Sequence, residues 1–262
     1  MMMYDALVCS KSTLELFMDV YGGCFKETVM VAAPPTKQTL GDLGRYESVA
    51  AIGGGAVIDT AKIVGNRVFC WPTTASGSSA TSHSVYWDGE KKCNCHRTPP
   101  ESVKWNDIFI NSLPAALYSR TKYDAISHCL DSMWSKDCTQ EVDSLARETL
   151  DILLDPASTR TEVMEAGHVA GHVIEQVPTT ILHALSYPMT SIYGIPHGDA
   201  LGIILKPVCD LMGESDVSNK IETLLHQYTY DPDIVVEKAK DYDKFHNTTK
   251  TINANKLKED LE

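Results

Sequence analysis

Three consecutive glycines, Gly53-Gly54-Gly55, separate an apolar run from a segment with helical spacing. The run Val49–Ile52 is short and continuous, as is typical of a strand buried on both faces. After the glycines, residues suited to a buried helix face recur at helical intervals: Ala56, Val57, Thr60, Ala61 and Val64. The segment therefore predicts a strand, a glycine turn and a helix, which places this part of the chain in an α/β fold.

The glycine turn has two interpretations. Glycines between a strand and a helix let the backbone approach a phosphate, and the helix N-terminus adds free N–H groups. The spacing is not G-x-G-x-x-G, however, and a tight turn without a ligand would use the same residues. A second short strand is predicted to begin at Val68, and a Ser/Thr-rich loop follows it. There Thr73 and Thr74 offer hydroxyls for a second phosphate or a ribose.

The chain changes character after Pro114. Before it, a strand-like stretch at Ile108–Ile110 still fits an α/β part. After it, helical periodicity runs from Ala115 to about Leu154, and again over Glu162–Glu175 and Thr179–Ser186. The sequence thus predicts an α/β domain over 1–114 and a helical domain over 115–262.

The negative overall charge argues against polyanionic partners. The chain has 35 acidic and 23 basic residues and a formal net charge of −12, which disfavours nucleic acid and anionic membranes. No run approaches the roughly 18–20 apolar residues of a membrane span, and the start is not a signal peptide. The eight scattered cysteines favour reduced thiols, so a cytoplasmic location is expected.

Two sets of side chains could bind a metal. Asp124 and His128 are four residues apart in a helical segment and therefore share one face. His183 and His197 follow, with a break between them at Pro188, Gly194 and Pro196, so that a helix, a bend and a return could bring both to the first pair. One carboxylate and three imidazoles suit Fe²⁺ or Zn²⁺.

The competing set is His168 and His172, also four apart, with Glu175 on the next turn. Spacing alone does not choose between the two sets, and an isolated histidine is more often a packing residue than a ligand.

Four segments, in the same order, resemble the iron-containing (group III) alcohol dehydrogenase family, whose fold also includes glycerol dehydrogenase and dehydroquinate synthase. They are AIGGGAVIDTAK, WPTTASGSSAT, YDAISHCLDSMWS and ILHALSYPMTSIYGIPHGDA. The resemblance implies a nucleotide-binding α/β domain followed by an all-helical metal-binding domain, with Fe²⁺ or Zn²⁺ and NAD or NADP as cofactors. It implies metal ligands at Asp124, His128, His183 and His197. It implies cofactor contacts at Gly53, Gly54, Gly55, Asp59, Thr73 and Thr74, whereas His168 and His172 fall where the family has small residues.

Several residues depart from the family pattern, and some strings point to one subgroup of the family. Tyr187 stands where the signature has a second histidine, and it could orient substrate, relay a proton, or simply pack beside the metal. The strings HALSYPMTSIYGIPHG, AISHCLDSMWS and SVYWD look most like a subgroup of phosphonate metabolism, whose members interconvert phosphonoacetaldehyde and 2-hydroxyethylphosphonate. Arg120 and Lys122 add unusual positive charge beside Asp124, and they either attract an anionic substrate or are simply solvated.

The resemblance therefore implies a metal- and nicotinamide-dependent oxidoreductase acting on a small aldehyde or alcohol, with a homodimer as the candidate assembly. Two alternatives stay open: a general iron-dependent alcohol dehydrogenase, and a degenerate member without catalysis. The second arises because only 52 residues precede Gly53, so a shortened N-terminal half is expected. The end of the chain resembles the family's closing segment and is expected to be complete.

Overall fold

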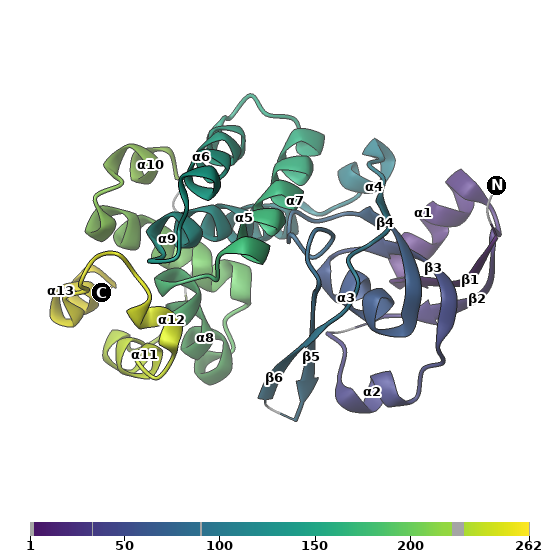
Figure 1. Cartoon of the computed structure of the whole chain (residues 1–262), viewed down its shortest axis with the longest axis horizontal. Helices are drawn as coiled ribbons and strands as arrows, with labels where there is room; N and C mark the ends of the chain where they lie inside the picture. Colours follow the sequence, from purple (N-terminus) through teal and green to yellow (C-terminus); the bar gives the residue numbers. More distant parts are fainter. Residues whose placement is uncertain (1–2, 33, 90, 222–227, 262) are drawn as a thin grey trace. The chain divides into compact units, whose positions relative to one another are not determined.

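The computed structural model describes residues 3–32, 34–89, 91–221 and 228–261. It contains two compact units, which we describe separately (Figure 1). The first comprises residues 1–118 and 159–172, and the second comprises residues 119–158 and 173–262. The short segment 159–172 thus belongs with the first unit, whereas the predicted functional division near residue 114 stays a prediction.

The first unit is built around a parallel sheet with the strand order β2-β1-β3-β4-β7 and a separate antiparallel hairpin of β5 and β6. This confirms the predicted α/β class. Its elements are β1 (Tyr4–Cys9), α1 (Lys11–Tyr21), β2 (Phe25–Met30), α2 (Lys37–Gly41), β3 (Tyr46–Gly53), α3 (Gly55–Val64), β4 (Gly65–Pro72), β5 (His83–Asp88), β6 (Lys91–His96), β7 (Ser102–Val103) and α4 (Asp107–Asn111).

The central strand β3 is buried on both faces, as the continuous apolar run predicts. Val49 and Ala51 pack into one core cluster with residues of α3, and Ala50 and Ile52 pack into a second cluster with Phe17 of α1. Successive strand residues point to opposite faces, so one strand serves both cores. The sheet is therefore covered by α3 on one face and α1 on the other (Figure 1).

The strand predicted at Ile108–Ile110 is wrong, because these residues form helix α4. The Asn106 side chain accepts a hydrogen bond from the backbone N–H of Ile108, which caps the helix N-terminus. Phe109 and Ile110 are buried while Ile108 is exposed. The apolar triplet therefore reflects one buried helix turn, which short runs cannot distinguish from a strand.

The second unit is helical, which confirms the predicted class of the C-terminal part. Helices α5 and α7 each begin in the first unit and continue into the second. Helix α8 packs against α9, α11 and α12, and α9 also packs against α10 and α13. The helices are α5 (Ala115–Trp134), α6 (Gln140–Leu154), α7 (Arg160–Gln176), α8 (Ile181–Tyr193), α9 (His197–Met212), α10 (Ser215–Lys220), α11 (Pro232–Ala239), α12 (Asp243–His246) and α13 (Ala254–Leu261).

Two global predictions can be compared with the structure. All eight cysteines are free thiols, as expected. A helix that crosses a membrane needs about 20 predominantly apolar residues, and none of the helices within the described ranges meets that requirement.

Candidate metal centre

Helix α5 carries two of the predicted ligands on one face. Asp124 and His128 lie one turn apart, and Nε2 of His128 is 3.4 Å from Oδ1 of Asp124. The helix is buried almost continuously from Tyr123 to Trp134. Both side chains consequently project into the interior of the helical unit, where a charged carboxylate needs compensation.

A sharp reversal between α8 and α9 supplies the other two ligands. Helix α8 ends at Gly194, whose φ of 68° is left-handed and suits glycine. Pro196 then precedes the first residue of α9, His197. As a result the rings of His183 and His197 lie 5.3 Å apart between centroids, although 14 residues separate them in the sequence.

The three predicted histidine ligands converge on one carboxylate oxygen of the fourth ligand, Asp124. Nε2 of His183 and Nε2 of His197 each lie 3.6 Å from Oδ1 of Asp124, at nearly the same distance as His128. Within the described ranges, the ligand atoms of Asp124, His183 and His197 form the single group of three or more metal-ligating side chains that lie within 4.8 Å of one another. His128 reaches the shared oxygen but lies outside that mutual group.

The donor set fits a divalent cation. Oδ1 of Asp124 is buried and has no hydrogen-bond partner, and its distances to the Nε2 atoms of His128, His183 and His197 exceed those of normal hydrogen bonds. Four ligands at about 2.1 Å from a tetrahedral metal would be about 3.4 Å apart, close to the separations observed. Carboxylate and imidazole donors suit iron or zinc, so these side chains could hold either ion.

Asp131 orients His183. Its Oδ2 accepts a hydrogen bond from Nδ1 of His183 at 2.8 Å and another from the His183 backbone N–H at 3.1 Å. The other oxygen accepts from Thr180 Oγ1 and from the backbone N–H of Leu182. A proton held on Nδ1 leaves the Nε2 lone pair directed to the ligand cluster. Sequence reasoning missed Asp131, although a carboxylate three residues after His128 lies on nearly the same helix face.

Asp124 and His128 are held in the protonation states that metal binding needs. Burial alone would raise the pKa of Asp124, but the facing imidazoles of His128, His183 and His197 more than offset this and lower it. Burial lowers the pKa of His128 to about 4, against the opposing charge of Asp124. For His183, burial is outweighed by its contacts with Asp124 and Asp131, which raise its pKa. Asp124 is thus a carboxylate and His128 a neutral imidazole near neutral pH.

An ion pair beside the cluster ties α5 to α9. The guanidinium of Arg120 contacts both carboxylate oxygens of Asp199, at 2.8 and 2.7 Å, and Tyr228 donates its hydroxyl proton to Asp199 at 2.7 Å. Gly198 permits this approach, because a Cβ there would lie 2.5 Å from the Arg120 carbonyl oxygen. The hypothesis that Arg120 attracts substrate is therefore wrong, since its charge is neutralised by a fully buried aspartate. The same hypothesis for Lys122 stays a prediction.

Tyr187 lies against the ligand histidines. Its ring stacks with His197 at a centroid distance of 6.2 Å and meets His183 edge-on at 6.3 Å. Its hydroxyl accepts a hydrogen bond from the ammonium of Lys244 at 3.2 Å. Lys244 was not identified from the sequence, because a lysine in a polar segment such as DYDKFH carries no signal of burial.

In the first unit, the glycine turn lies directly beside the Ser/Thr loop. A Cβ on Gly54 would lie 2.9 Å from Cγ2 of Thr74, and one on Gly55 would lie 3.1 Å from Oγ of Ser76. Gly54 is the N-cap of α3 and supplies no side-chain cap, so the first N–H groups of the helix keep their capacity to donate. The backbone of Thr73 donates to the carbonyl of Gly53 at 3.0 Å. Contact of these residues with the phosphates of a dinucleotide stays a prediction.

Asp59 and Lys62, both on α3, stabilise the Ser/Thr-rich loop and the start of β5 by hydrogen bonds. The Asp59 carboxylate accepts from Ser78 Oγ at 2.5 Å and from the backbone N–H of Val85 at 3.2 Å. Lys62, fully buried, donates to the carbonyl oxygens of Ser78, Thr81 and His83 and pairs with Asp59 at 3.1 Å. Direct cofactor contact by Asp59 stays a prediction, and its observed contacts are with the loop.

The competing histidines lie together in the first unit. Nε2 of His168 is 3.2 Å from Nε2 of His172, and Nδ1 of His168 is 2.9 Å from Oγ of Ser79. Burial, with a smaller contribution from His172, lowers the pKa of His168 to about 4. The pair does not gather a third metal-ligating side chain among the residues the structure describes.

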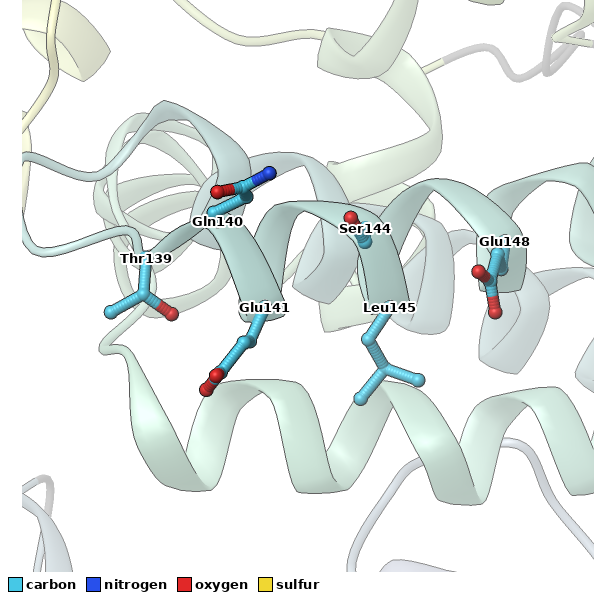
Figure 2. Close-up of a pocket in the computed structure, with 6 residues that line it drawn as sticks. All are labelled: Thr139, Gln140, Glu141, Ser144, Leu145 and Glu148. Atoms are coloured by element: carbon cyan, nitrogen blue, oxygen red, sulfur yellow. The ribbon is translucent and has the colours of Figure 1, made fainter.

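A surface hollow elsewhere carries none of this chemistry. Figure 2 shows the residues that line it, all on α6 or at its N-cap Thr139. Two glutamates, Glu141 and Glu148, face it without a histidine or a cation beside them. Its lining therefore lacks the carboxylate–histidine combination of the candidate metal centre.

Comparison with known proteins agrees with this architecture. Residues 119–257 match the sequence profile of the Fe-containing alcohol dehydrogenase family, C-terminal. Over 199 residues the chain is 30% identical to phosphonoacetaldehyde reductase of Streptomyces viridochromogenes, covering 70% of this chain and 50% of that protein. Over 230 residues it is 26% identical to maleylacetate reductase 1 of Rhodococcus opacus, covering 80% of this chain and 63% of that protein.

Solved structures share the fold. Sulfoacetaldehyde reductase from Bifidobacterium kashiwanohense, in complex with NAD⁺, superposes with a TM-score of 0.80 at 18% identity, covering 98% of this chain and 90% of the other. This chain combines a parallel α/β unit with a helical unit that carries a carboxylate–histidine cluster. The chain belongs to the iron-containing alcohol dehydrogenase family. It spans about half the length of the phosphonoacetaldehyde reductase that it matches.

Proposed function

We propose that this chain transfers hydride between a nicotinamide cofactor and a small aldehyde, with phosphonoacetaldehyde and 2-hydroxyethylphosphonate as the substrate pair. The observation that carries the proposal is the convergence of three imidazole nitrogens, at 3.4 to 3.6 Å, on one buried carboxylate oxygen without a hydrogen-bond partner. A bound cation would be coordinated by these atoms, whereas without one the buried carboxylate oxygen keeps an uncompensated desolvation free energy.

The side chains have separate roles in this proposal. When bound, the cation would act as a Lewis acid toward the substrate oxygen, and the nicotinamide would supply the hydride. Asp124, His128, His183 and His197 would hold the cation, and Asp131 keeps His183 in the ligating tautomer. The His197 side chain is 32% exposed, whereas those of His128 and His183 are 6% exposed. Substrate therefore has access from the His197 side, where Tyr187 can orient it or relay a proton.

Cofactor binding is assigned to the glycine cradle of the first unit. The uncapped start of α3 at Gly54 and Gly55 and the hydroxyls of Thr73 and Thr74 offer donors to phosphate and ribose oxygens. The NAD⁺ complex of a structural relative supports a nicotinamide dinucleotide at the same kind of fold. Both NADH and NADPH should be tested.

The choice of substrate draws on the relatives. The reductase that is 30% identical is named for phosphonoacetaldehyde, and the string HALSYPMTSIYGIPHG is the part of this sequence that points to the same subgroup. A general alcohol dehydrogenase would accept neutral aldehydes equally well, and a degenerate member would accept none.

The decisive experiment uses anaerobically purified chain reconstituted with Fe²⁺ or Zn²⁺. Oxidation of the reduced nicotinamide is followed by its near-ultraviolet absorbance, with phosphonoacetaldehyde or propanal as acceptor. We expect turnover that a chelator abolishes, a higher kcat/KM for phosphonoacetaldehyde, and none in Asp124→Ala. Equal kcat/KM values would favour the general dehydrogenase, and no turnover with either aldehyde would contradict the proposal. Light scattering on the same sample measures the predicted homodimer.

A further inference from the structure

Lys244 is a partly buried lysine whose ammonium forms no ion pair among the described residues. It lies on α12, and its ammonium donates to Thr179 Oγ1 at 2.5 Å and to Tyr187 Oη at 3.2 Å. It also lies 5.5 Å from the centroid of the Tyr187 ring. Among the residues that the structure describes, no carboxylate lies within ion-pair distance of this ammonium. Its two observed acceptors are both neutral hydroxyls.

Placing the Lys244 ammonium in this partly buried position costs desolvation free energy. Burial lowers the pKa of Lys244, and the charge of Asp131 offsets this only in part. An ammonium group has three donors, and only two of them have acceptors among the described residues. Desolvated charges in proteins are normally paired. The partly buried ammonium therefore has one donor left for a further acceptor.

The ammonium is one aromatic ring away from the candidate metal centre. The Tyr187 ring contacts His183 and His197 on one side, and its hydroxyl meets Lys244 at the other end. The charge of Lys244 also contributes to lowering the pKa of His128. Helix α12 packs against α8, which carries both Tyr187 and His183. Lys244 and two of the candidate metal ligands therefore contact the same side chain, Tyr187.

We propose that Lys244, with the hydroxyls of Thr179 and Tyr187, forms the subsite that binds the oxyanion of the substrate, so that aldehydes bearing a phosphonate close to the carbonyl are preferred. This inference rests on the proposed function and assigns its substrate class to named side chains. A local cation is needed for such a preference, because the chain as a whole carries a formal charge of −12 and repels anions. Arg120 cannot serve, since Asp199 already neutralises it.

The first test compares kcat/KM for phosphonoacetaldehyde and for propanal in the wild-type chain and in Lys244→Met, Lys244→Arg and Lys240→Met. Lys240 is the control, because its ammonium pairs with Glu237 a few residues earlier. We expect Lys244→Met to lose about 100-fold on phosphonoacetaldehyde and to change less than about threefold on propanal. Lys244→Arg should recover part of the loss, and Lys240→Met should behave as wild type. Equal losses on both aldehydes would overturn the proposal, because they would assign Lys244 to a proton relay through Tyr187 or to folding.

A second measurement does not require turnover. Methylphosphonate binding to the wild-type chain and to Lys244→Met is followed by phosphorus NMR, and binding is expected only in the wild type. Binding that depends on Lys244 in a chain that reduces neither aldehyde would support the subsite while contradicting the proposed function. Turnover of both aldehydes with a selectivity unchanged in Lys244→Met would contradict the subsite while supporting the function. If Lys244→Met folds poorly, the comparison of wild type with Lys244→Arg decides.

Discussion

Asp131 holds His183 in a single orientation through a hydrogen bond of 2.8 Å from Nδ1 to Oδ2, and neither side chain is more than 6% exposed. The same aspartate receives the backbone N–H groups of Leu182 and His183 at the first turn of α8. One carboxylate on α5 thus fixes both the start of α8 and the tautomer of the imidazole that α8 carries. The metal cluster is preorganised by this contact.

Replacing Asp131 by asparagine should weaken metal binding by about 10- to 100-fold. The amide can donate to Nδ1, which favours a proton on Nε2 and blocks the lone pair that faces Asp124. Metal affinity is measured by competition with a chromogenic chelator. Asp151→Asn, an exposed carboxylate on α6, is the matched control and should keep wild-type affinity. Unchanged affinity in Asp131→Asn would show that the carboxylate is not needed to set the tautomer.

Removing the metal should lower the thermal stability of the chain. A ligand that binds only the folded state contributes about 4 kcal/mol when its concentration is 1,000 times its Kd. We therefore expect the calorimetric midpoint to rise by at least about 5 °C when Fe²⁺ or Zn²⁺ is added to chelator-treated chain. Asp124→Ala should show no such rise. An equal rise in Asp124→Ala would place the binding elsewhere, with His168 and His172 as the first alternative.

Gly54→Ala should impair cofactor binding while leaving the metal centre intact. The new Cβ would lie 2.9 Å from Cγ2 of Thr74 and would force the two loops apart. We expect NADH affinity, measured by fluorescence titration, to fall by at least about 10-fold. Gly41→Ala is the control, because a Cβ there meets nothing within 4 Å.

A double variant tests whether Gly54→Ala lowers NADH affinity through a steric clash with Thr74 or through a change at the N-terminus of α3. Thr74→Ser removes the methyl group that the new Cβ would meet, so Gly54→Ala combined with Thr74→Ser should recover part of the lost affinity. No recovery would mean that contact with Thr74 is not the cause.

The positions of the candidate site residues were predictable where glycine or proline marks a turn next to them in the sequence. Gly53 to Gly55 predicted a strand, a turn and a helix because glycine lacks the Cβ that would collide with neighbouring side chains in such a turn, as those of Val57 and Thr74 do here. The positions of His183 and His197 followed in the same way, since Gly194 and Pro196 dictate a reversal between them. The sequence could not choose between these histidines and His168 with His172 on spacing alone, and resemblance to a family made that choice.

Other features depend on contacts that no local pattern encodes. The ion pair of Arg120 with Asp199 joins residues 79 positions apart, so Arg120 resembled a solvated or substrate-binding charge. Lys244 reaches Tyr187 across 57 positions, and its burial comes from the packing of α12 on α8. The misassigned strand at Ile108–Ile110 has a simpler cause, because a run of three apolar residues has no measurable period.

The pair of Arg120 and Asp199 should stabilise the fold mainly by neutralising a buried carboxylate. Arg120→Met removes the ion pair of the buried Asp199 carboxylate and should cost about 3 kcal/mol of unfolding free energy. Combining Arg120→Met with Asp199→Asn should cost less than Arg120→Met by itself, because no uncompensated charge remains. Urea unfolding of the four chains of this double-mutant cycle measures both values. A double variant that is less stable than either single variant would contradict this account.

His168 should make stability depend on pH in the first unit. Burial lowers its pKa in the folded chain from 6.5 to about 4. The unfolded chain therefore binds a proton at this site between those values and the folded chain does not, so the free energy of unfolding falls as pH falls from 6.5 toward 4. Because the side chain is only partly buried, the loss is about 1 kcal/mol.

The corresponding experiment compares the slopes of unfolding free energy against pH. His168→Gln should show a shallower decline than wild type across this interval, whatever its stability at neutral pH, because glutamine does not titrate. His96→Gln, in the same unit but exposed on β6, should keep the wild-type slope. A slope in His168→Gln equal to that of wild type would mean that the proton is taken up elsewhere, and that burial does not keep the His168 imidazole neutral.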